Sequence, residues 1–339
     1  MTIKYSTDAQ ISVGHEQRRD KTMKKIVAIV CVMLMLLGMT ACGNAADDGK
    51  YTVGICQLVT HDALDAATKG FQDALIEKLG EDKVEFDLQN AAGDSNTCAN
   101  IANAFVAAEV DLIMANATPA LQTAQAATAE IPILGTSVTE YGVALGIADF
   151  TGTVGGNVSG TSDLAPLEDQ AAMLQEWFPD AENVGLLYCS AEPNSKYQVD
   201  TIKALLEGKG YTCEMFAFAD SNDMQAVTNA ACEYSDVIYV PTDNAVASAT
   251  DIIDGICRPA GVPIIAGEEG ICGGCGVATL SISYYDLGYK TGEMAADILT
   301  GKADISTMKI EYAPATKKYN PTICADLGLT APEGYVAIG

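Results

Sequence analysis

Side chains able to bind both signs of charge recur where the apolar segments of this 339-residue chain end. Hydroxyl donors suited to an anionic group stand at Thr118, Ser137 and Thr139. Carboxylate acceptors suited to a cationic group stand at Asp243, Glu268 and Asp286. Further hydrogen-bonding groups follow other apolar segments, at Gln57, His61, Asp65, Asn194, Ser195 and Asn244. These residues are the candidates for a ligand-binding site.

Catalytic chemistry finds little support in the same sequence. It has no G-x-S-x-G, P-loop or H-E-x-x-H pattern. The two histidines are His15 and His61, and a lone histidine is more often a hydrogen-bonding or surface residue than a general base. Glu268 and Glu269 are adjacent, and adjacent carboxylates rarely share one glycosidase site. We therefore expect a binding protein without a cofactor, not an enzyme.

Parallel sheets must position these residues. Short apolar segments alternate with helical patterns such as the one over residues 64–79, which favours α/β layers with helices on both faces of each sheet. Strands are predicted at 52–57, 84–88, 111–115, 131–135, 184–188, 213–218, 237–240 and 262–266.

Four landmarks of the first half recur in the second at an offset of 125–131 residues. Val53-Gly54-Ile55 matches Val184-Gly185-Leu186, and Asp94-Ser95-Asn96 matches Asp220-Ser221-Asn222. Residues 111–113 and 131–133 likewise match 236–238 and 262–264. The repeat predicts two similar α/β lobes, whose strand ends meet at a shared ligand cleft.

The first 50 residues are typical of an export signal and tether. Basic residues at 18–25 precede an uncharged segment, Ile26 to Leu37, which is too short to span a bilayer comfortably as a transmembrane anchor. We expect residues 1–41 to be removed, with Met23 as the possible true start, and residues 42–50 to form a tether. The removal would change the net charge from −26 to −29, and so acidic a surface disfavours nucleic acid.

Five ordered motifs resemble those of ABC-transporter substrate-binding lipoproteins of the tryptophan/tyrosine uptake type. They are GGNVSG at 155–160, EPNSKYQ at 192–198, YVPTDN at 239–244, EEG at 268–270 and YYDLGY at 284–289. Met39-Thr40-Ala41-Cys42 also resembles a bacterial lipobox, with Met39 where Leu is usual, and this resemblance assigns lipidation to Cys42.

The resemblance implies a type I periplasmic-binding-protein fold with three crossovers between hinged lobes. The lobes would comprise residues 51–163 with about 281–307, and 164–280 with about 308–339. It also implies a monomer, held on the outer face of the cell membrane by its lipid alone, that delivers an amino acid to an ABC permease and its ATPase. A surface sensor or adhesin on the same scaffold is the alternative; a transcription regulator would need a helix-turn-helix segment, which we do not find.

An amino-acid ligand would place its carboxylate on the hydroxyl donors and its ammonium on an acidic acceptor, with Asp243 as the first choice. Thr118 and Asp243 could instead simply cap the helices that follow them. For an aromatic side chain, Tyr141, Tyr197, Tyr284 and Tyr285 are the candidates, although ordinary packing is the alternative for each. Trp177 fits a core position.

The cysteines are scattered through predicted strands and helices. Cys56, Cys189 and Cys213 are expected to pack as small apolar residues. Cys272 and Cys275 have C-x-x-C spacing, which leaves free thiols, a local disulfide or a metal site open. A zinc site would need further ligands nearby, and the sequence supplies none, so we expect no metal.

Overall fold

The computed structural model describes residues 49–338, which fold into two α/β lobes. The predicted signal peptide, the alternative start at Met23, Cys42 and most of the tether lie outside the described residues. Within residues 49–338, no helix combines the length and the apolar character that crossing a membrane requires.

The first lobe is built on a fully parallel sheet with the strand order β11-β5-β4-β3-β1-β2. Its strands are β1 (Tyr51–Gln57), β2 (Val84–Asn90), β3 (Leu112–Asn116), β4 (Ile133–Val138), β5 (Val158–Ser162) and β11 (Glu311–Tyr312). Its helices are α2 (Asp62–Leu79), α3 (Ser95–Ala107), α4 (Thr118–Ala127), α5 (Tyr141–Leu145) and α12 (Tyr284–Leu299), with short 3₁₀ turns at Glu81–Lys83 and Ile305–Thr307.

The second lobe repeats this plan with the strand order β13-β12-β10-β9-β8-β6-β7. Its strands are β6 (Asn183–Cys189), β7 (Thr212–Phe218), β8 (Val237–Val240), β9 (Ile264–Ala266), β10 (Ala278–Ser281), β12 (Thr316–Tyr319) and β13 (Val336–Ala337). Only β12 runs antiparallel to a neighbour, β10. The helices are α6 (Leu167–Trp177), α7 (Pro193–Gly208), α8 (Ser221–Tyr234), α9 (Asn244–Ala247), α10 (Thr250–Ala260), α11 (Glu269–Cys275) and α13 (Pro321–Asp326).

The predicted repeat is confirmed in detail. Strands β2-β1-β3-β4-β5 of the first sheet have the same order as β7-β6-β8-β9-β10 of the second. Asp94 caps α3 by accepting a hydrogen bond from the Thr97 N–H, and Asp220 caps α8 by accepting one from Asn222. Since the eight predicted strands all form, the expected architecture of two similar α/β lobes is correct.

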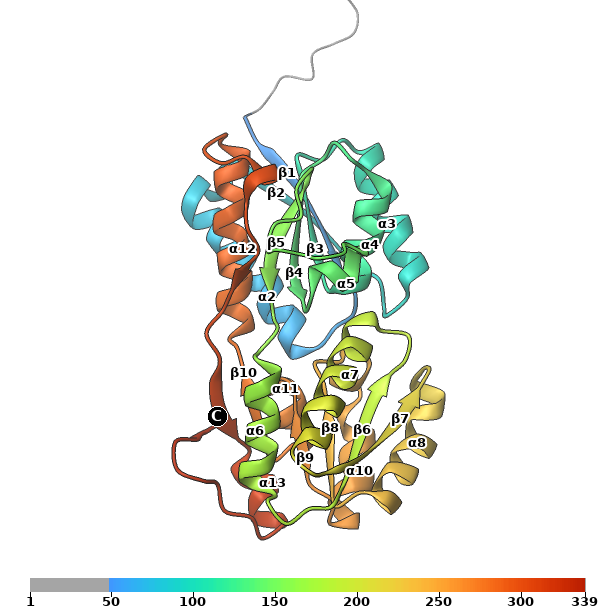
Figure 1. Cartoon of the computed structure of the whole chain (residues 1–339). Coiled ribbons are helices and arrows are strands. Elements are labelled where there is room, and N and C mark those ends of the chain that lie inside the picture. The colour runs from blue at the N-terminus through green and yellow to red at the C-terminus, as the bar shows by residue number, and fades with distance from the viewer. Residues whose placement is uncertain (1–48, 339) are drawn as a thin grey trace, which may run out of the picture. The chain divides into compact units, whose positions relative to one another are not determined.

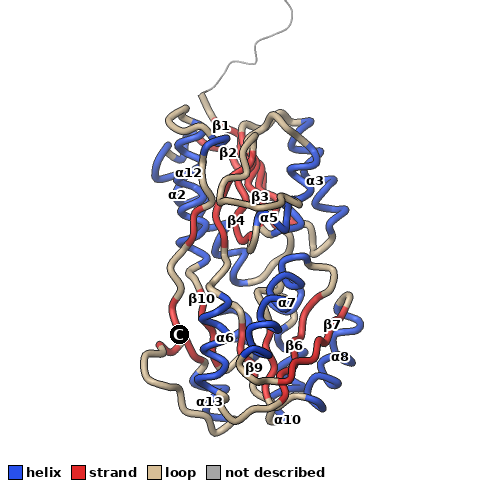
Figure 2. The backbone as a smooth tube through the Cα atoms, in the orientation of Figure 1, coloured by secondary structure: helices blue, strands red, loops and turns tan. Residues whose placement is uncertain are grey.

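The chain passes between the lobes after β5, after β10 and after β11 (Figure 2). Because β11 pairs with β5, residues up to Tyr312 belong to the first sheet. The prediction that the second lobe resumes at about residue 308 is therefore wrong by several residues, since these two edge residues carry no apolar strand pattern. These passages bring residues distant in sequence to one place between the lobes.

The apolar segments form the cores as predicted. Trp177 is buried in a second-lobe cluster with Leu174 and Tyr239, which confirms its core role. Cys56, Cys189 and Cys213 are free and buried, as expected of small apolar residues. In the first lobe a smaller cluster joins Ala63 and Ala67 of α2 to Tyr284 and Leu287 of α12 and to Ile282 of the second crossing.

Candidate functional site: a polar cleft between the lobes

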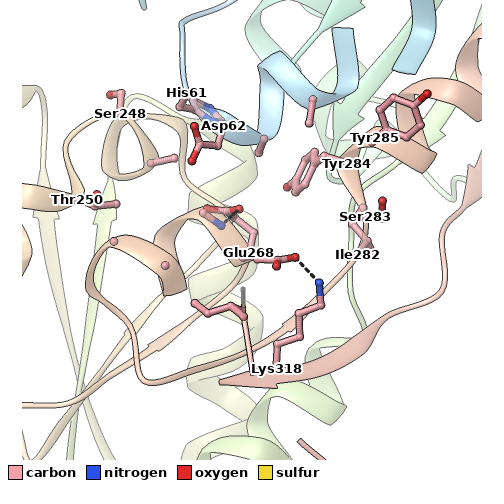
Figure 3. Close-up of a pocket in the computed structure, with 18 of the residues that line it drawn as sticks. His61, Asp62, Ser248, Thr250, Glu268, Ile282, Ser283, Tyr284, Tyr285 and Lys318 are labelled. Atoms are coloured by element: carbon pink, nitrogen blue, oxygen red, sulfur yellow. Dashed lines mark hydrogen bonds and ion pairs between the residues drawn. The ribbon is translucent and has the colours of Figure 1, made fainter. Parts of the chain in front are cut away.

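A pocket of about 790 Å³ opens where α2 of the first lobe faces α9 and α11 of the second. Its volume lies in the range of small-molecule sites. Figure 3 shows His61 and Asp62 on one side, Tyr284, Tyr285 and Ser283 on another, Glu268 near the centre and Lys318 below it. Adjacent to it lies a small inner cavity of about 10 Å³, room for about one water molecule. The two share His61, Ala247, Glu268 and Tyr284.

Asp163 contributes a buried carboxylate to the inner cavity from the first crossing between the lobes. The Tyr284 hydroxyl donates to its Oδ2 at 3.0 Å, while its Oδ1 has no hydrogen-bond partner. Burial raises the pKa of Asp163 to about 6, although hydrogen bonds from Thr139 and Tyr284 oppose the shift. Its Oδ1 therefore remains available as a hydrogen-bond acceptor in a residue that lines the inner cavity.

Glu268 lines both cavities from the N-cap of α11. Its carboxylate accepts from the backbone N–H groups of Gly270, at 2.6 Å, and Ile271. Burial raises the pKa of Glu268 to about 7 against these bonds. Glu269 also lines the outer pocket, where it is half-exposed and accepts from Lys318.

Asp243 is buried beside the inner cavity and also caps a helix. Its Oδ2 accepts from the Cys189 N–H at 2.7 Å and its Oδ1 from the Val246 N–H at 2.9 Å. Burial and then the charge of Glu192 raise its pKa to about 7. Asp243 therefore caps α9, as the alternative interpretation predicted, and it also lines the inner cavity.

Glu192 and Asn244 connect the second lobe to His61. Glu192 accepts from the side chain of Asn244 at 2.6 Å and from the Ala245 N–H at 2.9 Å. The Asn244 Oδ1 lies 3.3 Å from His61 Nε2, which joins the first turns of α9 and α2 across the cleft. Burial lowers the pKa of His61, so the ring is neutral at neutral pH, and its Nδ1 lacks a partner.

The inner cavity consequently combines acidic groups with no cationic side chain among the residues that line it. Asp163, Asp243 and Glu268 all have raised pKa values for the same first cause, burial. A cation entering this space would stabilise their ionised forms. In the described part of the chain, no group of His, Cys, Asp and Glu has the geometry to hold a metal ion. An organic ammonium fits the arrangement.

The other predicted site residues lie farther from the inter-lobe pocket. Gln57 donates to Asp65 Oδ1 at 2.6 Å and accepts from Thr68, so this pair lies beside a separate groove of the first lobe. Asp286 is exposed in the first turn of α12, where its N–H donates to Ser283. Its placement in the cleft is wrong because the helix turns Tyr284 inward and Asp286 outward.

The hydroxyl candidates are buried in the first lobe. Thr118 begins α4, whose N-cap is Ala117 instead, so the alternative that Thr118 caps the helix is wrong. Ser137 adopts a left-handed φ of 53°, and its buried hydroxyl has no partner. Thr139 hydrogen-bonds to Asp163. Of these, only Thr139 is tied directly to a residue that lines the inner cavity.

In the second lobe, Asn194 and Ser195 support the cleft from α7. Asn194 donates to Glu192 and to the Thr242 carbonyl, each at 3.1 Å, and its Oδ1 has no partner. Ser195 hydrogen-bonds to Asp243. Tyr197 is half-buried against the second-lobe core.

Among the aromatic candidates, Tyr284 and Tyr285 line the pocket. Tyr141 lies in the first-lobe core, where its hydroxyl donates to the Thr161 carbonyl at 3.0 Å.

Sequence reasoning missed Asp163, Thr242 and the role of Glu192. Asp163 follows β5, a strand that its small and polar residues, VSGTS, concealed. Because the strand itself gave no apolar signal, the sequence did not show that this acidic residue follows a strand end. Cys272 and Cys275 are both free and buried, and each sulfur donates to a backbone carbonyl of α11 or its end. Among the alternatives left open, the structure has free thiols.

Comparison with known proteins gives consistent matches over nearly the whole described chain. The sequence model of the family described as "ABC transporter substrate binding protein" matches residues 52–337. A protein named "Tyrosine-binding protein" from Clostridioides difficile is 36% identical over 295 residues, which cover 83% of this chain and 85% of that protein.

Two solved structures carry the comparison further. An ABC domain from Streptococcus pneumonia in complex with L-Trp is 31% identical, covers 85% of this chain and 100% of that one, and has a TM-score of 0.81. The ligand-free, open structure of a Clostridium difficile substrate-binding protein with adhesive properties is 36% identical, covers 85% and 99%, and has a TM-score of 0.66. The ligand complex therefore has the higher TM-score of the two despite its lower identity. The fold is that of type I periplasmic binding proteins, as the resemblance implied.

Proposed function

We propose, from the premise that this chain belongs to the family of ABC transporter substrate-binding proteins, that it binds an aromatic amino acid between its lobes. Tyrosine and tryptophan are the proposed ligands, and the bound amino acid is delivered to a membrane permease driven by its ATPase. Domain closure around the ligand is the expected motion.

One observation carries this proposal: buried carboxylates line the inner cavity without a cationic side chain among them. An amino-acid ammonium supplies the missing positive charge. Asp163 is the foremost acceptor, because among the carboxylates that line the inner cavity only its Oδ1 is buried without a hydrogen-bond partner. Glu268 and Asp243 would attract the ammonium through their negative charge and not through direct hydrogen bonds, because backbone N–H groups already donate to their oxygens.

The ligand carboxylate would take hydroxyl and backbone donors of the first lobe. Ser137 is the strongest candidate there, since its buried hydroxyl has no partner and its backbone is held at a positive φ. Thr139 and the first turn of α4 at Thr118 complete the proposed donor set.

An aromatic side chain would extend from the inner cavity into the larger pocket, which Tyr284 and Tyr285 line. The names of two relatives favour this ligand class, since one is called tyrosine-binding and another holds L-Trp. We include in the proposed site His61, Asn194, Ser195 and Asn244, which hold the second lobe's carboxylates in place or join the lobes.

We further propose that the chain acts outside the cytoplasm as a monomer, anchored through lipid on Cys42 after residues 1–41 are removed. The basic segment, apolar segment and lipobox-like sequence support this part of the proposal. Metabolic labelling with a radioactive fatty acid should label the native chain and leave Cys42→Ala unlabelled.

Isothermal titration calorimetry of the purified chain against the twenty amino acids tests the ligand class. Tyrosine or tryptophan should bind with a micromolar or lower Kd, and Asp, Glu and Lys should not bind. Phenylpropionate, which lacks the ammonium, should bind at least about tenfold more weakly than phenylalanine. An equal affinity of the two compounds, or no micromolar binding by any amino acid, would overturn the proposal.

Surface adhesion is a second candidate function, favoured by one observation: a relative with 36% identity is described as having adhesive properties. Binding of purified chain to cultured host cells, with and without saturating tyrosine, distinguishes the two roles. Uptake of labelled amino acid lost on deletion of the gene supports transport, whereas unaffected uptake with lost cell binding supports adhesion.

A further inference from the structure

Two cysteines face one another on neighbouring helices of the second lobe, away from the cleft. Cys232 lies near the end of α8 and Cys257 near the end of α10, and these helices pack side by side (Figure 1). Their Sγ atoms are 3.1 Å apart. A disulfide bond is about 2.05 Å long, so a closing movement of about 1 Å would join them.

We propose that Cys232 and Cys257 form an oxidisable dithiol site that closes to a disulfide on reaction with a low-molecular-weight disulfide. This site lies apart from the ligand cleft, and the proposal does not rest on the function proposed above. The reaction requires one sulfur that the reagent can reach and a second sulfur placed to attack the mixed disulfide. Cys232 and Cys257 differ in accessibility as these two roles require.

Accessibility separates the two thiols. Cys232 is half-buried, whereas Cys257 is only 1% exposed within the core of the second lobe. The hydrogen bond from the Cys257 thiol lowers the pKa of Cys232, while the same contact and burial raise that of Cys257. Cys232 is therefore the nucleophile and Cys257 the resolving thiol.

The reaction balances as two thiol–disulfide exchanges. The Cys232 thiolate attacks one sulfur of the reagent, breaks its S–S bond and releases one thiolate. Cys257 then loses its proton and attacks Cys232 Sγ, which releases the second reagent thiolate. Two protein thiols are oxidised to one disulfide, the reagent is reduced to two thiols, and the two protons pass to the released thiolates.

Other cysteines of the described chain lack this combination. Cys56 and Cys98 share a thiol hydrogen bond, but both are fully buried in the first lobe. Four further cysteines direct their sulfurs to backbone carbonyls: Cys189, Cys272, Cys275 and Cys324. Cys213 is buried, and no thiol partner accounts for its raised pKa.

The disulfide would close a 25-residue separation that includes β8 and α9. This segment carries Asp243 and Asn244, so oxidation would restrain the part of the second lobe that supplies the cleft residues. Because a cross-link restricts the unfolded chain, the oxidised protein should have a Tm about 5 °C higher than the reduced one.

The test is incubation of the folded full chain with oxidised glutathione, followed by intact mass measurement and peptide mapping. We expect the loss of two hydrogen atoms and no lasting glutathione adduct. Cleavage at Asp and Glu separates Cys232 and Cys257 from Cys272 and Cys275, because Glu268 and Glu269 lie between them. The linked peptides should contain Cys232 and Cys257.

Cys232→Ser and Cys232→Ala should abolish both the mass change and the Tm rise, and Cys257→Ser should instead retain a glutathione adduct on Cys232. Cys213→Ser is the matched control and should still form the bond. A disulfide between any other pair, or a stable glutathione adduct on the unaltered chain, would overturn the proposal. So would an unchanged mass of the folded chain, provided that all its thiols react after denaturation.

Discussion

Asp163 occupies an unusual position for a carboxylate, because it is buried in a segment that passes between two lobes. Tyr284, which follows the second crossing, donates to one of its oxygens, and the other oxygen has no hydrogen-bond partner. The environment of this carboxylate therefore depends on the relative position of the two crossings and on the charge of the group that fills the cavity.

Replacing this carboxylate should weaken ligand binding strongly. Asp163→Asn keeps the shape but removes the charge, so the Kd for the best amino-acid ligand should rise about 10- to 100-fold. Calorimetry at pH 7.5 measures the change. Asp62→Asn is the matched control, since Asp62 lines the outer pocket but is exposed, and its Kd should stay within about twofold. Equal effects of the two substitutions would contradict this role.

How far individual site residues could be predicted depended on the strand before them. Asp243 and Glu268 follow the apolar strands β8 and β9, and both lie at the cavity as expected. Asp163 follows β5, whose residues carry no apolar pattern, and was missed. Asp286 was misplaced because a residue's side of a helix depends on the N-cap, here Ser283, which the sequence alone did not locate.

At the scale of elements, α2 and α12 form the closest helix pair of the first lobe (Figure 1). Glycines permit this approach: a Cβ on Gly288 would lie 1.9 Å from the Ala67 carbonyl oxygen, and one on Gly70 would lie 2.1 Å from that of Tyr285. Since α2 begins beside His61 and α12 begins at Tyr284, this contact sets the spacing of two cleft residues.

Gly288→Ala should therefore lower stability and binding together. The added methyl group meets backbone, which cannot move aside, so the free energy of unfolding should fall by about 1–3 kcal/mol. The Kd should also rise, because the helix starts shift. Urea unfolding and calorimetry measure these effects.

Gly255→Ala in α10 is the control for adding the same methyl group. Gly255 is exposed, and nothing lies within 4 Å of the position of its Cβ. Helix propensity alone should then raise the stability by about 0.5–1 kcal/mol and leave the Kd unchanged. If Gly288→Ala and Gly255→Ala change the free energy of unfolding in the same direction, then the close packing of α12 on α2 does not explain the effect of Gly288→Ala.

Elements were predictable in proportion to their apolar content. The long buried strands, such as β1 and β6, formed where expected, and β5, β10, β11, β12 and β13 were missed. Strands β11, β12 and β13 lie toward the sheet edges with largely unburied side chains, so backbone pairing holds them. Strands β5 and β10 are fully buried but short, and their small and hydroxyl residues do not form an apolar segment. The last crossing was misplaced for the same reason.

For the whole molecule, the buried carboxylates make stability depend on pH. Burial raises the pKa of Asp163 to about 6 and those of Asp243 and Glu268 to about 7, whereas the unfolded values lie near 4. Between pH 4 and 7 the folded chain binds more protons than the unfolded one, so its stability falls as pH rises.

The ligand-free chain should accordingly be less stable at pH 8 than at pH 5, by about 2 kcal/mol or more, measured by urea unfolding. The lowered pKa of His61 acts in the opposite direction within this window, but one histidine opposes three carboxyls. The exposed carboxyls with lowered pKa values, such as Asp94 and Asp304, lose their contribution only below pH 4 and do not affect this window. Asp163→Asn should reduce the difference, and saturating ligand should reduce it further. A stability that rises from pH 5 to pH 8 would contradict the raised pKa values of these three buried carboxyls.

The return of β11 to the first sheet also has a consequence for the order of synthesis. Because Glu311 and Tyr312 complete that sheet and α12 covers it, the first lobe lacks an edge strand and a helix until nearly the whole chain has left the ribosome. The second lobe likewise waits for β12 and β13. Neither lobe can mature early, so the nascent polypeptide stays incompletely folded for most of its elongation, which is the state that a threading translocase accepts.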